Sequence, residues 1–115
     1  MSAVSTHVLD TVRGEPASGI VVRLERVGSG ELGRATTDAD GRISDFGVTS
    51  LSAGTYRLIF ETAAYLAGEG FGEADSKAIV FFPEIVVTFA ADGLRPRYHV
   101  PLLLSAYSYT TYRGS

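Results

Sequence analysis

Hydrophobic and polar residues alternate along several short stretches of the chain. In residues 19–27, for example, Ile20, Val22 and Leu24 face one way, while the residues between them face the other. An alternation with period two is typical of a β-strand that buries one of its faces. On this basis we predict strands at residues 4–10, 19–27, 33–37, 55–61, 84–91, 97–104 and 106–112.

Glycine, proline and aspartate separate these stretches and predict turns at residues 14–17, 28–30, 38–41 and 92–93. Residues 62–68 break the alternation with good helix formers, and Thr62 can cap this short helix while Gly68 can end it. The stretch 70–77 then has the composition of a loop. Seven or eight short strands with one short helix predict an all-β protein, an antiparallel β-sandwich.

Composition narrows the class of protein further. The chain has 115 residues, the usual size of one domain, so we expect residues 1–115 to form a single domain. A net charge of -3 gives no basis for nucleic-acid binding, and no apolar run approaches the roughly 20 residues of a membrane span. Without cysteine there are no disulfides and no thiolate zinc sites. The first residues lack a secretory signal, so we expect a soluble, cytoplasmic protein.

The last two predicted strands have an unusual composition for a monomer. Three consecutive leucines, residues 102–104, are followed by Tyr107, Tyr109 and Tyr112 with hydroxyl residues between them. Tyrosine is enriched at protein interfaces because it offers a large area with a polar tip. The pattern favours a surface covered by another subunit over its alternative, an ordinary sandwich strand with one core face.

Polar recognition in this chain depends on few residue types, because the sequence contains no Asn, Gln, Cys or Trp. The chain has two histidines, each in the middle of a predicted strand. Alternation puts His7 on one face with Ser5 and Leu9, and His99 on one face with Arg97. A lone histidine is more often structural, but an imidazole is the side chain best suited to proton transfer near neutral pH.

Arg42 follows the Asp40-Gly41 turn, where it is either a solvated charge or a guanidinium held for a planar anionic or carbonyl group. Two other motifs do not predict a binding site. Residues 38–41 resemble part of a calcium loop, but the later acidic ligand is missing. Residues 68–72 are rich in glycine but lack the strand and helix of a phosphate loop, and the histidine spacing does not suit a metal.

Motifs at both ends of the chain resemble those of the transthyretin-like 5-hydroxyisourate hydrolases. Residues 6–10 (THVLD) and 13–19 (RGEPASG) are similar to the opening motifs of that family, and residues 98–105 (YHVPLLLS) to its penultimate motif. The tail Tyr112-Arg113-Gly114-Ser115 resembles the ending that separates these hydrolases from transthyretin itself. Residues 82–84 and the turn 40–42 match as well, so the resemblance covers essentially the whole chain.

The resemblance implies a transthyretin-like sandwich that assembles as a homotetramer, a dimer of dimers, with its sites at the dimer–dimer interface. It implies hydrolysis of 5-hydroxyisourate to 2-oxo-4-hydroxy-4-carboxy-5-ureidoimidazoline in urate degradation, with no metal and no organic cofactor. The residues that it implies as catalytic are His7, Arg42, His99 and Ser115, and those implied in substrate binding are His7, Arg42, Tyr112 and Arg113. The alternative is a transthyretin-like carrier that binds a small ligand without catalysis and needs neither the histidines nor the tail.

Overall fold

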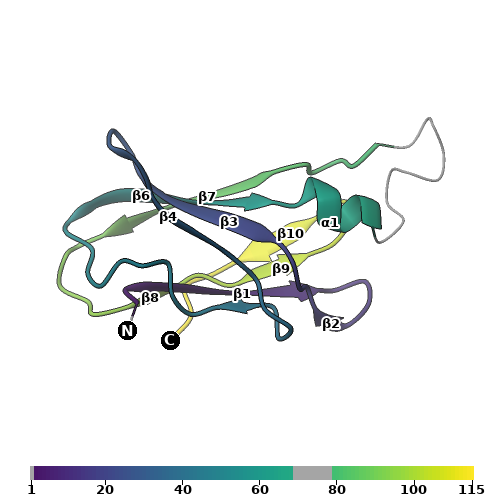
Figure 1. The fold of residues 1–115 in the computed structure, drawn as a ribbon, viewed down its shortest axis with the longest axis horizontal. Helices are drawn as coiled ribbons and strands as arrows, with labels where there is room; N and C mark the ends of the chain where they lie inside the picture. The colour runs from purple at the N-terminus through teal and green to yellow at the C-terminus, as the bar shows by residue number, and fades with distance from the viewer. Residues whose placement is uncertain (1, 69–78) are drawn as a thin grey trace.

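The computed structural model describes residues 2–68 and 79–115, which form two β-sheets packed face to face and one short helix (Figure 1). The elements in chain order are β1 (Val4–Asp10), β2 (Glu15–Pro16), β3 (Val21–Arg26), β4 (Gly30–Thr36), β5 (Arg42–Ile43), β6 (Gly54–Glu61), α1 (Ala63–Gly68), β7 (Ile85–Ala91), β8 (Tyr98–His99), β9 (Leu102–Leu104) and β10 (Tyr109–Thr111). The predicted all-β sandwich with one short helix is therefore confirmed.

The first sheet has six strands and is built around β1. Its path runs β10-β9-β1-β2, and β5 and β8 also pair with β1. The pairing of β1 with β8 and with β9 is parallel, whereas its pairing with β2 and with β5 is antiparallel. Parallel neighbours need a long connection, and here the whole second sheet lies between β1 and β8 in the sequence. The sandwich is thus mostly, but not entirely, antiparallel.

The second sheet has four antiparallel strands in the order β4-β3-β6-β7. Its inner face carries the residues that the alternation of β3 and β6 predicts, since Val22, Leu24, Leu58 and Phe60 are fully buried. The register places Val22 opposite Phe60 and Leu24 opposite Leu58, so each pair points into the core together. Val4 and Val8 from β1 join the same core cluster from the other sheet.

Two predicted strands were too long. Residues 97–104 form β8 and β9 instead of one strand, because Pro101 between them has no N–H to donate to a neighbouring strand. Residues 106–112 contribute only β10, because the chain first turns: the Ser105 N–H donates to the Ser108 carbonyl at 2.9 Å. Alternation alone does not reveal either interruption.

Elsewhere the structure has strands that were predicted too short or not predicted at all. The short strand β2 lies inside the predicted turn 14–17, and β5 begins directly after the predicted turn 38–41; neither strand was predicted. Strand β4 begins three residues before the predicted 33–37. The helix is confirmed at Ala63–Gly68. The hydroxyl of Thr62, which we predicted to cap this helix, donates a hydrogen bond to the Phe82 carbonyl at 2.5 Å. The predicted loop 70–77 lies outside the described residues, as does most of the glycine-rich stretch 68–72. None of the described helices is long and apolar enough to cross a membrane.

Candidate functional site

Strand β1 brings the sequence-distant polar residues of the site together. Its burial alternates, so Val4, Thr6 and Val8 point into the core, while Ser5 and His7 point outward. On one side of β1, the register places Ser5 beside His99 of β8. On the other side it places His7 opposite Arg42 of β5. We call this outer surface of the six-stranded sheet, with Ser5, His7, Arg42 and His99, the site face.

The C-terminal tail lies directly on this face. The Gly114 N–H donates to the His99 carbonyl at 2.8 Å, which makes an isolated antiparallel bridge beyond β10. A Cβ atom at Gly114 would lie 2.5 Å from Cδ2 of the His99 ring, closer than real Cβ atoms approach other atoms. Glycine is therefore required here for the tail to approach the imidazole this closely. In Figure 1 the yellow C-terminal segment accordingly ends next to β8.

A cleft of about 760 Å³ opens on the site face, which is within the size range of small-molecule sites. We call it the cationic cleft because four arginines line it, together with His99 and the tail. These arginines are Arg42, Arg95, Arg97 and Arg113. None of the four forms an ion pair with a residue of the described ranges 2–68 and 79–115. The cleft therefore presents positive charge that is available to an anionic ligand.

Arg42 is held by its turn through the backbone. The Asp38 carboxylate accepts hydrogen bonds from the backbone N–H groups of Asp40 and Arg42, each at 2.9 Å. The Asp38 N–H in turn donates to the Arg42 carbonyl at 3.0 Å, where β5 begins. The backbone of Arg42 is thus fixed while its side chain stays exposed to the cleft. This geometry fits a guanidinium held on a rigid turn, one of the two interpretations of the sequence.

The two histidines are held by different partners. The His7 ring donates from Nε2 to the Asp40 carbonyl at 2.9 Å, and since a carbonyl can only accept, Nε2 of His7 carries a hydrogen. Nδ1 of His99 lies 2.8 Å from the Ser5 hydroxyl, a group that can donate or accept. His7 itself does not line the cationic cleft but stands beside Arg42, which does.

His99 is also the histidine with an altered acidity. Burial lowers the pKa of His99 below its ordinary value, and the positive charges of Arg42 and His7 lower this pKa further. Hydrogen bonding with the backbone of Ser5 raises this pKa and is the smallest contribution. Near neutral pH the ring is therefore mostly neutral, which leaves a nitrogen lone pair that can accept a proton.

The structure brings most of the sequence-predicted site residues together. Arg42, His99, Tyr112, Arg113 and Ser115 all line the cationic cleft, and His7 lies next to it. Several lining residues were not predicted as site residues, among them Ser5, Arg95 and Arg97. Ser5 carries a signal that could have identified it, because it shares the alternating face of His7.

Arg95 and Arg97 flank Pro96 just before β8, so both reach the cleft from the same short segment. Within the described part of the chain, no group of three or more histidine, aspartate or glutamate residues could hold a metal ion. The chemistry that this site can supply comes from imidazole, guanidinium and hydroxyl groups, which suit proton transfer and the stabilisation of negative charge.

The fold and the site together define an all-β sandwich protein with an imidazole and several guanidinium groups at one open cleft. The model of the HIUase/Transthyretin family matches residues 4–114. A 5-hydroxyisourate hydrolase of Caulobacter vibrioides is 39% identical, and the match covers 100% of each chain. The chain therefore belongs to the HIUase/Transthyretin family, as the motifs at its two ends indicated.

Solved structures agree with this assignment. A 5-hydroxyisourate hydrolase of Klebsiella pneumoniae superimposes with a TM-score of 0.83 at 36% identity, over 100% of both chains. A transthyretin from Sparus aurata superimposes equally well, with a TM-score of 0.84 at 29% identity, over 99% of this chain and 97% of the other. Because hydrolase and transthyretin structures fit the fold equally well, the fold does not distinguish enzyme from carrier, and the site has to do so.

Proposed function

We propose that this chain hydrolyses 5-hydroxyisourate to 2-oxo-4-hydroxy-4-carboxy-5-ureidoimidazoline, a step of urate degradation, with residues 1–115 forming a single hydrolase domain. The observation that carries the proposal is the cationic cleft, where the neutral imidazole of His99 stands among arginines free to bind an anion. Full-length similarity to the Caulobacter vibrioides hydrolase supports the same substrate. No metal or organic cofactor takes part in the proposed reaction.

The proposed reaction is the addition of water to an acyl carbon of the six-membered ring, followed by cleavage of its C–N bond. A base removes a proton from the water, the carbonyl oxygen carries negative charge in the intermediate, and the leaving nitrogen takes up a proton. We assign the base to His99, because its lowered pKa keeps it neutral and it lines the cleft. His7 is the second proton-handling group, with Nδ1 left for this purpose since Nε2 donates to Asp40.

The arginines and the tail bind the substrate in this proposal. Arg42, fixed by its turn, stabilises the developing oxyanion and orients the carbonyl groups of the substrate. Tyr112 and Arg113 bind the polar edge of the ring, and Ser115 helps to hold the attacking water or a histidine. Such groups lower the barrier most when they are held in place before the substrate arrives, which the Gly114–His99 bridge favours.

We further propose that the chain is cytoplasmic and works as a homotetramer, a dimer of dimers with the sites at the dimer–dimer interface. Strands β7 and β10 each end their sheet within the described residues. The ring of Phe82, just before β7, lies 5.2 Å from the ring of Tyr109 in β10. Exposed tyrosines, Tyr107 and Tyr112, extend the same region. Exposed edges and aromatic residues of this kind favour association. Sedimentation of the purified protein tests the proposal, and a monomer at micromolar concentration would refute it.

The second candidate function is that of a carrier, which the similarity to the Sparus aurata transthyretin favours. A carrier has to bind its ligand without changing it. It has no need of a histidine kept neutral beside Arg42 or of a tail packed on that histidine. These features favour the hydrolase.

An ultraviolet assay with freshly prepared 5-hydroxyisourate tests the two functions directly. The proposed enzyme makes the absorbance of the substrate decay much faster than it does spontaneously, in proportion to protein concentration. Arg42→Gln keeps a polar side chain but removes the charge, and it slows the decay because the oxyanion loses its partner. Decay at the spontaneous rate in the presence of the folded native chain would refute the hydrolase and leave the carrier.

A further inference from the structure

Ser5 is the side chain in contact with His99 to which neither the family resemblance nor the proposed mechanism gives a role. It occupies the position of β1 that pairs with His99 in the parallel register. Its hydroxyl oxygen lies 2.8 Å from Nδ1 of the ring, and its carbonyl accepts the N–H of Val100 at 3.0 Å. The strand pairing and its backbone hydrogen bond therefore hold the serine hydroxyl next to one ring nitrogen.

The imidazole of His99 is held from two opposite sides. Nδ1 and Cδ2 are the two ring atoms bonded to Cγ, and they lie on opposite edges of the ring. Nδ1 lies against Ser5, while Cδ2 lies against the backbone of Gly114. A half-turn of the ring would exchange these atoms and leave the Ser5 hydroxyl against a carbon. The contacts therefore select one ring orientation, in which Nε2 is the nitrogen left for a substrate.

From this geometry we propose that Ser5 is a positioning residue: its hydroxyl accepts a hydrogen bond from Nδ1–H of His99 and so leaves the lone pair of the neutral ring on Nε2. The partner of one imidazole nitrogen decides which nitrogen carries the hydrogen. This assignment rests on the proposed function, in which His99 is the base. It adds that the base acts through Nε2 and that a serine on the neighbouring strand sets this state.

The protonation of a neutral imidazole gives the consequence of this contact. Burial and the charges of Arg42 and His7 lower the pKa of His99, and the backbone of Ser5 raises it by a smaller amount. A neutral ring carries a hydrogen on one nitrogen only, so a hydroxyl that accepts from Nδ1–H leaves Nε2 as the nitrogen that can take up a proton. A hydrogen bond that the ring donates also stabilises its protonated form, so we expect the Ser5 hydroxyl to raise the pKa of His99.

Nitrogen-detected NMR of the native chain and of Ser5→Ala tests the proposal, because the chain has only two histidines to assign. In the native chain, the neutral ring of His99 carries its hydrogen on Nδ1. In Ser5→Ala this preference is reduced, and the pKa of His99 falls because the acceptor is lost. Turnover falls by about tenfold, the lower end of the cost of losing a residue that orients a functional histidine, and KM changes little.

Two further variants separate positioning from a general loss of structure. Ser5→Thr keeps the hydroxyl on a residue suited to strands and restores both the tautomer and the turnover. Ser52→Ala removes a hydroxyl that accepts a hydrogen bond from Arg26 at 2.6 Å outside the cationic cleft, and it changes neither quantity. The acid limb of the pH–rate profile shifts to lower pH in Ser5→Ala alone, together with the pKa of His99.

The outcomes distinguish this proposal from the proposed function. If Ser5→Ala leaves the tautomer and the pKa of His99 unchanged, Ser5 does not position the ring, whatever the activity. If Ser5→Ala changes both while the native chain fails to hydrolyse 5-hydroxyisourate, the positioning contact is real and the proposed function is wrong.

Discussion

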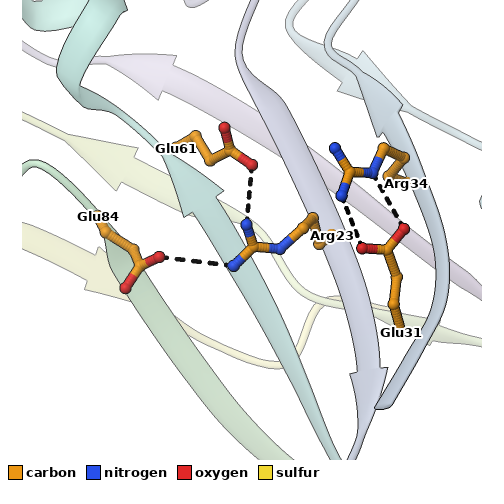
Figure 2. A network of polar contacts seen from close by, with 5 residues as sticks. All are labelled: Arg23, Glu31, Arg34, Glu61 and Glu84. Atoms are coloured by element: carbon orange, nitrogen blue, oxygen red, sulfur yellow. Dashed lines mark hydrogen bonds and ion pairs between the residues drawn. The ribbon is translucent and has the colours of Figure 1, made fainter.

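Arginines on the two outer faces of the sandwich differ in how their charge is compensated. On the four-stranded sheet, which we call the paired face, Arg23 contacts Glu61 at 3.0 Å and Glu84 at 3.6 Å (Figure 2). Arg34 makes two contacts with Glu31, at 2.8 and 3.0 Å. On the site face, by contrast, the four arginines of the cationic cleft form no ion pair with a carboxylate of the described residues.

The contrast shows where the chain keeps charge for a ligand. Both faces are solvated and both belong to regular sheets, so strand structure does not explain the difference. Arginines gathered around one cleft repel each other, which disfavours the folded state unless an anion binds there. Around Arg23 and Arg34 on the paired face, glutamates compensate the charge, and the pKa of Glu31 is lowered mainly by its hydrogen bond with Arg34. We therefore expect substitutions on the site face to change activity, and those on the paired face to change stability slightly.

The largest effect is expected at the histidines of the site face. His99→Ala removes the proposed base and His7→Ala the second proton-handling group, so each lowers turnover by about 10² or more. Steady-state kinetics with 5-hydroxyisourate gives turnover, and circular dichroism checks that each variant is folded. If both variants stay folded and retain near-native turnover, the histidines do not perform the chemistry and the proposed mechanism is wrong.

The second largest effect on turnover is expected at the contact between the tail and the imidazole of His99. Gly114→Ala would place a Cβ atom 2.5 Å from Cδ2 of His99, so the tail or the ring has to move. Gly114 is not in the left-handed region of backbone conformation, so the strain comes from this contact. We expect turnover to fall between about tenfold and 10²-fold, as a displacement of about 1 Å can do. Deletion of residues 113–115 lowers it at least as far.

Gly68→Ala is the matched control for Gly114→Ala. A Cβ atom at Gly68 would meet no atom of residues 2–68 or 79–115 within 4 Å, and this glycine also lies outside the left-handed region. The control is therefore expected to keep native turnover. Equal kinetics for Gly114→Ala and the native chain would remove the tail contact from the explanation of the site.

Much of the sandwich could be predicted from the sequence, because burial of one face imposes alternation. Val22, Leu24 and Phe60 point into the core as their spacing requires. The interruption at Pro101 and the turn at Ser105 depend on single hydrogen bonds and not on hydrophobicity, so the alternation continued through both. Strand pairing was also inaccessible, since the parallel neighbours of β1 come from the far end of the chain.

Residues of the site could be predicted only where they belong to a family motif. The motifs indicated His99 and the tail, and the structure lays Gly114 on the His99 ring. Composition could not place Arg95 in the cleft, because a charged residue after a turn is ordinarily a solvated one. The partner of each imidazole was inaccessible for a different reason: it depends on which strand lies beside β1, and therefore on the register.

A smaller effect is expected from one arginine of the cationic cleft. Arg97→Gln removes a positive charge and keeps a polar side chain. It raises KM roughly fivefold, because one charge interaction near water is worth about 1 kcal/mol. Salt screens this attraction, so added salt raises the KM of the native chain more than that of the variant. Arg57→Gln changes the net charge equally on the paired face, and it leaves KM unchanged. An equal KM increase in both variants would mean that net charge, and not the cleft, attracts the substrate.

The smallest effect is expected from the paired face itself. Arg23→Gln removes the cation between Glu61 and Glu84 but keeps most of the aliphatic part of the side chain that covers the sheet. Partly exposed ion pairs contribute about 1 kcal/mol or less, so the free energy of unfolding falls by no more than this in a denaturant titration, and less at high salt. Arg34→Gln, which breaks a more exposed pair, has a smaller effect on stability. Neither changes turnover, because both charges are already compensated on their own face. A large loss of activity in Arg23→Gln with unchanged stability would contradict the expectation that the site face determines activity and the paired face only stability.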